Sequence, residues 1–264
     1  TNVDRWMLPD GVDEVLPEQA QDVEYLRRQL LDLYHNWGYD LVIPPMVEFT
    51  ESLLSGSGSD LDLMTFRITD QLSGRMMGIR ADITPQAARI DAHCLNREGP
   101  VRLCYADSVL HTKPRGLLTS RVPIRVGAEL YGHAGVECDI ELICLMHATL
   151  EAASVPDIHH VLGHVGIFRA LVDAAEIDAD TEARLFDAVQ RKAYDEISEV
   201  LNASVASDAL RELLTKLTQL SGDENVLDEA LAAFASAPVN SPAVAHPVLA
   251  LRVTLDQYRI YNQQ

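Results

Sequence analysis

The sequence lacks the features that would assign the chain to a membrane or secreted class of protein. No apolar run approaches the roughly 18 residues needed to cross a bilayer. The first residues do not show the basic-then-apolar order of a secretory signal. Four cysteines are present without a C-x-x-C pair, which favours free thiols over disulfides or a metal site. We therefore expect a cytoplasmic globular protein with no membrane contact.

Basic residues are scarce relative to acidic ones. The 264 residues include 40 Asp and Glu against 21 Lys and Arg, which gives a formal net charge of −19. Proteins that bind nucleic acids depend on Lys and Arg to neutralise phosphates, and no cluster of bases stands out here. We therefore expect no nucleic-acid partner. A small anion or nucleotide in a local pocket stays compatible with this charge.

Common catalytic and metal-binding motifs are also absent. The sequence contains no Walker A motif, no G-x-G-x-x-G, no G-x-S-x-G and no H-E-x-x-H. His159, His160 and His164 lie close together, but the first two would point to opposite faces of a strand. We therefore expect no metal site and no cofactor.

Hydrophobic periodicity predicts a mixed α and β fold for the first part of the chain. An amphipathic helix is expected to begin at Pro17 and to end before Gly38. A second helix should follow Thr84 as its N-cap, with Pro85 at the first helical position, and a third should be capped by Asp139. Strands are expected in YDLVIPP (39–45), LMTFRI (63–68), RMMGIR (75–80), VRLCYADSVLH (101–111), IRVGAELYG (124–132) and IHHVLGHVGI (158–167).

The composition changes at about residue 167, where Ala, Leu, Asp and Glu dominate and glycine nearly disappears. We therefore predict an α+β core over 1–166 and a helical insert over 167–237. The remaining segment, 238–264, should hold the end of a proline-rich linker and a helix over 248–261 that returns to the core.

Two short stretches combine charges in a pattern that is compatible with a ligand site. In MGIRADITPQAARIDAH (77–93), Arg80, Asp82 and Thr84 stand on alternate positions just before a helix. In PIRVGAELYG, Arg125 and Glu129 flank Gly127 on one face of a strand, which would leave a concavity. Two converging acids could hold an ammonium group or an N–H-bearing ring. Surface salt bridges between strands explain the same pattern equally well.

The order of several motifs resembles the class II histidyl-tRNA synthetase core. The motifs are LPDG, WGYDLVIPP, IRADITPQAARI, RLCYADSVLHTKP and RVGAELYGHAG followed by DIELI. Four stretches also resemble the sequences of a paralogous family, the regulatory subunits of ATP phosphoribosyltransferase. These stretches are LPDGVDEVLP, ESLLSGSG, TFRITDQLSGRMMGIRADITPQAARIDAH and VLHTKPRG. The resemblance implies an antiparallel sheet flanked by helices, with a helical insert.

The resemblance also implies roles for individual residues. Asp82 and Thr84 stand where the synthetase pocket binds the α-amino group of histidine, and Glu129 stands where it recognises the imidazole ring. Arg125 replaces a Gln that usually helps to hold the amino group, so it either reaches the carboxylate or disables the pocket. His111 occupies the place of the Arg that grips the ATP α-phosphate, and a mostly neutral imidazole lacks the fork of Arg.

From this resemblance we expect a non-catalytic regulatory subunit. It would form a dimer-based hetero-oligomer with the short catalytic subunit of ATP phosphoribosyltransferase and activate it in the first step of histidine biosynthesis. It would also help to transmit feedback inhibition by L-histidine. The alternatives are a purely structural scaffold for that enzyme and a histidine–tRNA ligase fragment.

The resemblance implies that a Gly- and Tyr-rich pocket segment and a third motif would follow residue 264. We therefore expect the C-terminal part of the core to be missing from this chain.

Overall fold

The computed structural model describes residues 6–55, 59–114, 116, 119–235 and 241–262, and the statements below concern these residues. The chain forms two compact units, Thr1–Ile158 and His159–Gln264. Each unit is described by itself. The limits 1–166, 167–237 and 238–264 stay a prediction for the whole protein.

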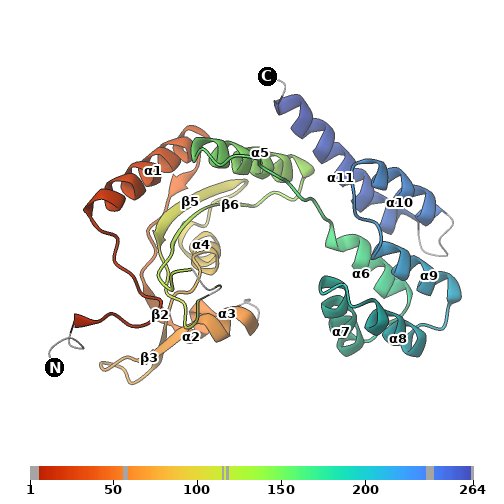
Figure 1. Ribbon diagram of the computed structural model, residues 1–264, viewed down its shortest axis with the longest axis horizontal. Helices are drawn as coiled ribbons and strands as arrows, with labels where there is room; N and C mark the ends of the chain where they lie inside the picture. The colour runs from red at the N-terminus through yellow and green to blue at the C-terminus, as the bar shows by residue number, and fades with distance from the viewer. Residues whose placement is uncertain (1–5, 56–58, 115, 117–118, 236–240, 263–264) are drawn as a thin grey trace. The chain divides into compact units, whose positions relative to one another are not determined.

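The first unit mixes helices and strands, as predicted (Figure 1). Its helices are α1 (Pro17–Asn36), α2 (Thr50–Leu53), α3 (Ser59–Met64), α4 (Thr84–Ile90) and α5 (Val136–Ala152), and a π-helical turn over Asp91–Leu95 follows α4. Its strands are β1 (Asp40–Leu41), β2 (Val47–Phe49), β3 (Phe66–Thr69), β4 (Met76–Ile79), β5 (Val101–Ser108) and β6 (Ile124–Tyr131).

Two small sheets organise this unit. The first has the order β1-β5-β6, with β1 parallel to β5 and β5 antiparallel to β6, and the second has the order β2-β4-β3, antiparallel throughout. In Figure 1, α1 and α5 lie on one side of β5 and β6, and α4 lies on the other side. The predicted β3–β4 and β5–β6 pairs are confirmed.

Helix α1 ends as its sequence predicts. Leu30 and Tyr34 in its C-terminal half are buried, and Tyr34 packs with Cys104 of β5. Gly38 then adopts a φ of +84°, and the Tyr39 amide donates to the Tyr34 carbonyl at 3.0 Å. This is the arrangement in which a left-handed residue closes a helix C-terminus, and glycine reaches it without steric cost.

The sheet face toward α1 and α5 is apolar with one polar network at its margin. Cys104 packs there with Tyr34, Tyr39 and Leu145. At the margin, Arg102 binds both oxygens of Glu141 at 2.6 and 2.7 Å, and the Tyr39 hydroxyl donates to Glu141 at 2.9 Å. The hydrogen bonds from Arg102 lower the pKa of Glu141 below its ordinary value, although burial opposes them.

Two predicted helix caps are wrong. Thr84 is the first residue of α4, so Ile83 precedes the helix, and the Thr84 hydroxyl donates to Glu129 instead of capping. Asp139 lies inside the first turn of α5, which begins at Val136. An acid in the first turn still interacts favourably with the helix dipole.

Two element predictions are wrong in the second half of the chain. Residues 158–167 do not form a strand, because the segment is irregular up to His164 and α6 begins at Val165. The His164 ring accepts a hydrogen bond from the Gly166 amide and so caps this helix. The last helix begins at Ser241 and not at residue 248, and it contains Pro247.

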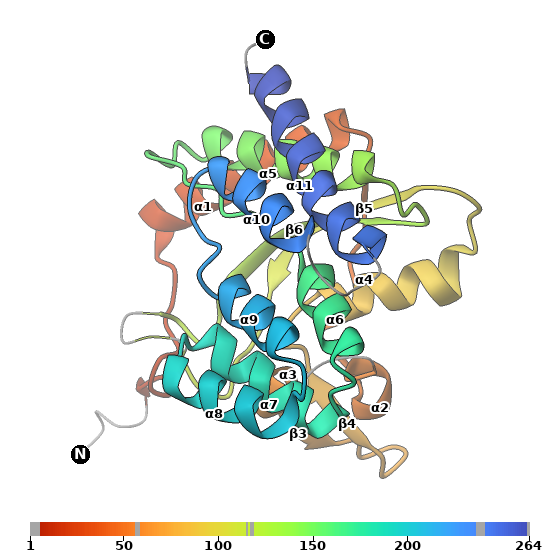
Figure 2. The ribbon, with the colours of Figure 1, turned by 90° about the vertical axis from the view of Figure 1, so that its right-hand side faces the viewer.

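The second unit is all helical (Figure 2). Amphipathic helices surround one core that includes Phe168, Leu171, Leu201 and Leu214, and α11 packs against α6 and α10. No described helix is long and apolar enough to cross a membrane. The helices are α6 (Val165–Ala174), α7 (Ala179–Gln190), α8 (Tyr194–Ser204), α9 (Asp208–Leu217), α10 (Asn225–Ala235) and α11 (Ser241–Asn262).

The Glu141 network leads to a stability prediction. Replacing Glu141 with Gln should lower the free energy of unfolding by about 1–3 kcal/mol at pH 7, because Arg102 loses its charged partner. The pKa of Glu141 is lowered by folding, so this stabilisation is present above the ordinary glutamate value of about 4.3. It is lost as the pH falls through the lower folded value. Denaturant unfolding should therefore show a smaller difference in the free energy of unfolding between the natural protein and Glu141→Gln at pH 3 than at pH 7.

The matched control is Glu151→Gln on the same helix, where the carboxylate is 64% exposed. This control should change stability little at either pH. An equal loss for both variants, or a loss for Glu141→Gln that persists at pH 3, would contradict the assignment.

Candidate functional site

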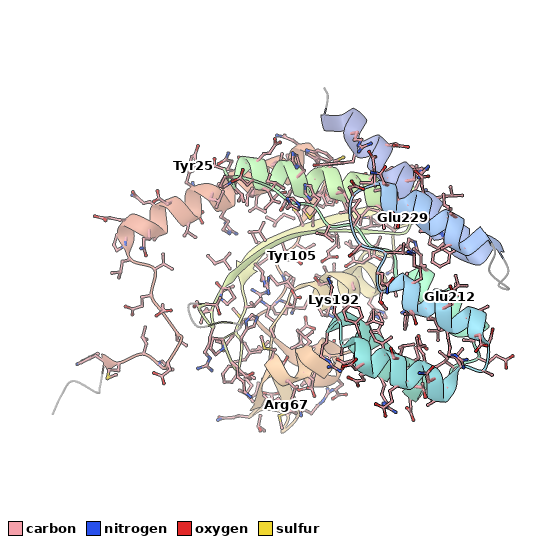
Figure 3. The ribbon with its side chains drawn as sticks, turned by 45° about the vertical axis from the view of Figure 1, so that its right-hand side comes forward. Tyr25, Arg67, Tyr105, Lys192, Glu212 and Glu229 are labelled. Carbon is pink, nitrogen blue, oxygen red and sulfur yellow. The ribbon has the colours of Figure 1, made fainter. Side chains whose placement is uncertain are left out.

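The candidate residues of β6 lie on the sheet face that α4 covers. In the antiparallel register, Tyr105 stands opposite Gly127, and Asp107 stands opposite Arg125. Residues that pair across strands project to the same face. Figure 3 labels Tyr105 on the β5–β6 pair, and its ring joins the apolar cluster that contains Ala87 of α4.

One carboxylate oxygen of Glu129 receives two hydroxyl groups. The Thr84 hydroxyl donates to Glu129 Oε1 at 2.8 Å, and the Tyr105 hydroxyl donates to the same oxygen at 3.1 Å. The two hydroxyl oxygens are themselves 3.1 Å apart. Thr84 and Glu129, which are 45 residues apart in the chain, are therefore brought into direct contact, as a common site requires.

Asp82 lies beside this group without a direct hydrogen bond to it among the described residues. Its Oδ1 accepts from the Ile83 amide at 2.7 Å, which fixes the carboxylate at the start of α4. Its negative charge is felt by Tyr105, whose pKa it helps to raise. Asp82 therefore acts on the site through the electrostatic effect of its negative charge and not through a direct hydrogen bond.

The tyrosines near Glu129 stay protonated. Burial is the largest cause that raises the pKa of Tyr105 far above its ordinary value, and the charges of Glu129 and Asp82 add to it. Burial and the Glu129 charge also raise the pKa of Tyr131. The site thus combines carboxylates with neutral hydroxyl donors, a combination that favours an ammonium group or an N–H-bearing ring over an anion.

The concavity predicted over Gly127 is filled. A Cβ at Gly127 would stand 2.5 Å from both Cζ and the hydroxyl oxygen of Tyr105. The glycine therefore serves to admit the tyrosine ring and not a ligand. Sequence reasoning missed Tyr105, because its place opposite Gly127 depends on the β5–β6 register.

Arg80 does not face a ligand, although it was grouped with the candidate residues. Its side chain is 1% exposed and donates to the carbonyls of Ser108 at 2.9 Å and Pro44 at 2.8 Å. It also pairs with Asp107 Oδ2 at 2.8 Å. These contacts make it a structural residue that anchors the chain just before α4.

Arg125 and His111 lie in contrasting surroundings. Arg125 is partly buried, and its Nε has no hydrogen-bond partner among the described residues. His111 is 2% exposed, and its Nε2 lies 3.0 Å from the carbonyl oxygen of Ala81. The His111 ring therefore contacts a backbone carbonyl, that of Ala81, next to the site.

A cavity of about 540 Å³ lies on another face of α4. Thr84, Ala88, Arg89 and His93 line it from α4 and the π-helical turn, and Ser52 lines it from α2. Thr84 therefore stands between this cavity and the Glu129 carboxylate. No group of three or more described His, Cys, Asp or Glu residues is placed to hold a metal ion.

Comparison with known sequences finds relatives of one family. A family model described as Histidyl-tRNA synthetase matches residues 11–258. A Stutzerimonas stutzeri protein named ATP phosphoribosyltransferase regulatory subunit is 60% identical over 236 residues, covering 89% of this chain and 59% of that protein. An Ectopseudomonas mendocina protein of the same name is 56% identical over 273 residues, covering 98% and 69%. The chain thus spans between 59% and 69% of the length of these two curated relatives.

Comparison with solved structures supports the same fold. A Bacillus halodurans structure titled ATP phosphoribosyltransferase regulatory subunit/histidyl-tRNA synthetase has a TM-score of 0.84 at 25% identity, covering 97% of this chain and 65% of that one. A histidyl-tRNA synthetase from Nostoc has a TM-score of 0.74 at 16% identity, covering 96% and 58%. The predicted class II synthetase-like α+β fold is confirmed.

The contact between Tyr105 and Gly127 can be tested by substitution. Gly127→Ala should lower the free energy of unfolding by about 1–3 kcal/mol, because the new methyl group overlaps the tyrosine ring. In a Tyr105→Leu background the same substitution should cost much less, since the shorter side chain leaves room. Denaturant unfolding of the four proteins measures this coupling.

Gly116→Ala is the control, because a Cβ there meets only ordinary contacts at 3.8 Å. If Gly127→Ala costs the same in both backgrounds, the register-dependent contact is not the reason for the glycine.

Proposed function

The chain belongs to the histidyl-tRNA synthetase family and, within it, to the ATP phosphoribosyltransferase regulatory subunits, and we propose that the whole protein is a non-catalytic subunit of that enzyme. The family membership confirms the resemblance predicted from the sequence motifs. In this proposal the protein binds the short catalytic subunit and activates the first step of histidine biosynthesis. The observation that carries it is the 56% identity to a relative of that name along 98% of this chain.

The surroundings of His111 support the non-catalytic part of the proposal. Synthetase chemistry needs a cation that stabilises charge on the α-phosphate. His111 is 2% exposed, with its ring directed to the Ala81 carbonyl, so it offers no charged fork to a phosphate. Four free cysteines agree with the further proposal that the protein works in the reducing cytoplasm.

The Glu129 site supports L-histidine as the effector. Glu129 accepts the neutral hydroxyls of Thr84 and Tyr105 on Oε1, and a carboxylate held in this way can also accept from an imidazole N–H. Asp82 and Thr84 supply a carboxylate and a hydroxyl for the ammonium group. Arg125 completes the proposed set. A purely structural scaffold is the second candidate, because an arginine in this pocket would repel an ammonium group.

The proposed regulation follows from linkage. A subunit that binds the active form of the enzyme more tightly shifts the enzyme toward that form. Histidine that binds the two states of the complex with different affinity shifts the balance back, by a factor set by that difference. A ligand that binds both states equally would shift nothing.

Exposed apolar residues around β1 support self-association. Strand β1 pairs only with β5 among the described strands, so it forms an edge of the first sheet. Beside this edge, Leu41, Ile43, Met46 and Val47 are 48%, 76%, 41% and 37% exposed. These four residues lie within one short segment, 41–47, and exposed apolar side chains favour burial against a partner. We propose that this surface, the β1 edge surface, joins two copies of the protein within the hetero-oligomer.

The central test measures phosphoribosyl-ATP formation by the short catalytic subunit with and without the whole protein, over a histidine titration. We expect faster turnover that histidine suppresses. Glu129→Gln should retain the activation but raise the histidine concentration for half-inhibition by about 10- to 100-fold, because a charged hydrogen bond is lost.

Glu98→Gln, an exposed carboxylate on the loop before β5, is the control and should leave the titration unchanged. Activation without any histidine response would favour the scaffold. No complex and no activation would overturn the regulatory proposal, and histidine-dependent ATP–pyrophosphate exchange would then indicate a ligase.

The β1 edge surface can be tested separately. Ile43→Lys should weaken self-association by at least about 10-fold, because a charge would be buried in an apolar contact. Light scattering over a concentration series measures the change. Leu72→Lys, at a position that is 98% exposed on the β3–β4 hairpin, should leave the oligomeric state unchanged. Equal behaviour of the two variants would rule out this surface.

A further inference from the structure

The sheet β2-β4-β3 carries apolar side chains over one whole face. Residues that pair directly across strands project to the same face, and so do residues two apart in one strand. The register therefore gathers two rows of apolar side chains on this side, which we call the β4 apolar face. The rows are Val47, Ile79 and Phe66, and Phe49, Met77 and Ile68.

The opposite face of the sheet is covered within the unit, whereas the β4 apolar face is not. Gly78 is buried on the covered side, where a Cβ would stand 2.9 Å from both Leu53 of α2 and Thr65. Each residue of the β4 apolar face is half-buried or exposed, and none belongs to a described apolar core. Val47 and Ile68 are 37% and 39% exposed. A contiguous apolar surface of this kind favours contact with a partner.

Two guanidinium groups lie against the phenylalanine rings of this face. Cζ of Arg75 is 3.5 Å from the centroid of the Phe49 ring. Cζ of Arg121 is 5.2 Å from the centroid of the Phe66 ring. The Arg75 side chain is still 49% exposed, so the flat side that faces away from Phe49 can receive a second aromatic ring. The face therefore suits an apolar partner that includes an aromatic side chain.

Arg121 also connects this face to an exposed apolar segment of the same chain. Its Nη1 donates to the Asp10 carbonyl at 3.0 Å, and its amide donates to the Gly11 carbonyl at 2.7 Å. Gly11 has a φ of +73°, and a Cβ there would stand 3.0 Å from Cδ of Arg121, so glycine permits this close contact. Residues 6–10, which we call the arm, include three large apolar side chains: Trp6, Met7 and Leu8, which are 82%, 68% and 45% exposed.

The arm has the chemistry that the face suits, but it does not cover the face of its own chain. Its exposed fractions show that its apolar side chains lie in solvent, although Arg121 holds Gly11 beside Phe66. The face is continuous with the β1 edge surface, because Val47 belongs to both. In a two-fold pair of copies each surface is used twice, so two copies that meet at the β1 edge surface bring two arms and two faces to one interface.

We propose that two copies of the protein exchange their arms, so that Trp6, Met7 and Leu8 of each copy pack on the β4 apolar face of the other. The indole ring of Trp6 stacks on the exposed side of Arg75 across this contact. The arm exchange rests on the self-association proposed for the β1 edge surface. It requires neither the histidine site nor the catalytic subunit.

Two variants of the whole protein remove the two sides of the contact separately. Trp6→Ala removes an aromatic anchor, and Ile68→Lys places a charge in an apolar contact. Each should weaken self-association by at least about 10-fold in a light-scattering concentration series. The controls are Val15→Ala, at an exposed apolar residue outside the arm, and Thr69→Lys, at an exposed residue on the opposite face of β3. Both controls should associate normally.

A mixture of the two variants separates exchange between copies from a contact within one copy. In a mixed pair, the intact arm of Ile68→Lys meets the intact face of Trp6→Ala, so one of the two contacts is restored. The mixed pair should therefore associate at least about 3-fold more tightly than either variant alone. A contact within one copy predicts no such gain, and the absence of a gain would overturn the exchange.

Tryptophan fluorescence reports the environment of Trp6 directly. The difference between the emission of the natural protein and that of Trp6→Phe isolates this residue. It should shift to shorter wavelength as the concentration rises through the association range, because the indole leaves water. Emission typical of an exposed indole at every concentration would overturn the proposal. A shielded indole in the dilute monomer would also overturn it, since the arm would then lie on its own chain.

The outcomes also separate the arm exchange from the proposed self-association. If Trp6→Ala and Ile68→Lys associate normally while Ile43→Lys does not, the arm exchange is overturned and the β1 edge surface stands. A natural protein that stays monomeric at every concentration overturns both. Circular dichroism establishes that each variant is folded.

Discussion

The first unit depends on a single buried guanidinium, that of Arg80. It ties the chain before α4 to the end of β5 and to the carbonyl of Pro44. An arginine that is 1% exposed is tolerated only when its donors are satisfied, and leaving one such donor without an acceptor costs about 1–3 kcal/mol. The start of α4 is therefore fixed against the sheet, and Thr84 reaches Glu129 for this reason.

The β5–β6 register decides what occupies the site face. Tyr105 stands opposite Gly127, and only a residue without a Cβ leaves room for the ring. The ring brings its hydroxyl to Glu129, where burial keeps it protonated. A shift of the register by one residue would turn Tyr105 to the other face of the sheet and leave Glu129 without this donor. The site is thus a consequence of packing as much as of its charged residues.

The sequence was most informative where a pattern depends on local spacing. Helix α1 and the β3–β4 and β5–β6 pairs could be predicted, because their periodicity and turn residues act within short segments. The segment before α6 was assigned wrongly, since an apolar run with histidines and glycine fits both a strand and an irregular approach to a helix. The Thr84 cap failed because a tertiary partner, Glu129, outcompetes a local hydrogen bond. Tyr105 and the pairing of Arg80 with Asp107 depend on strand register, which no single stretch reveals.

The proposed function requires binding and catalysis to be separated on one fold. Binding an amino acid requires groups that complement its ground state, and Glu129 with its two hydroxyl partners is of this kind. Activating the amino acid requires a further cation that stabilises charge developing on a phosphate. The resemblance implies that His111 stands at the place of that cation, and the His111 ring lies against the Ala81 carbonyl. Under the proposed function, a change at this one buried position would remove the group needed for catalysis and leave the proposed recognition residues in place.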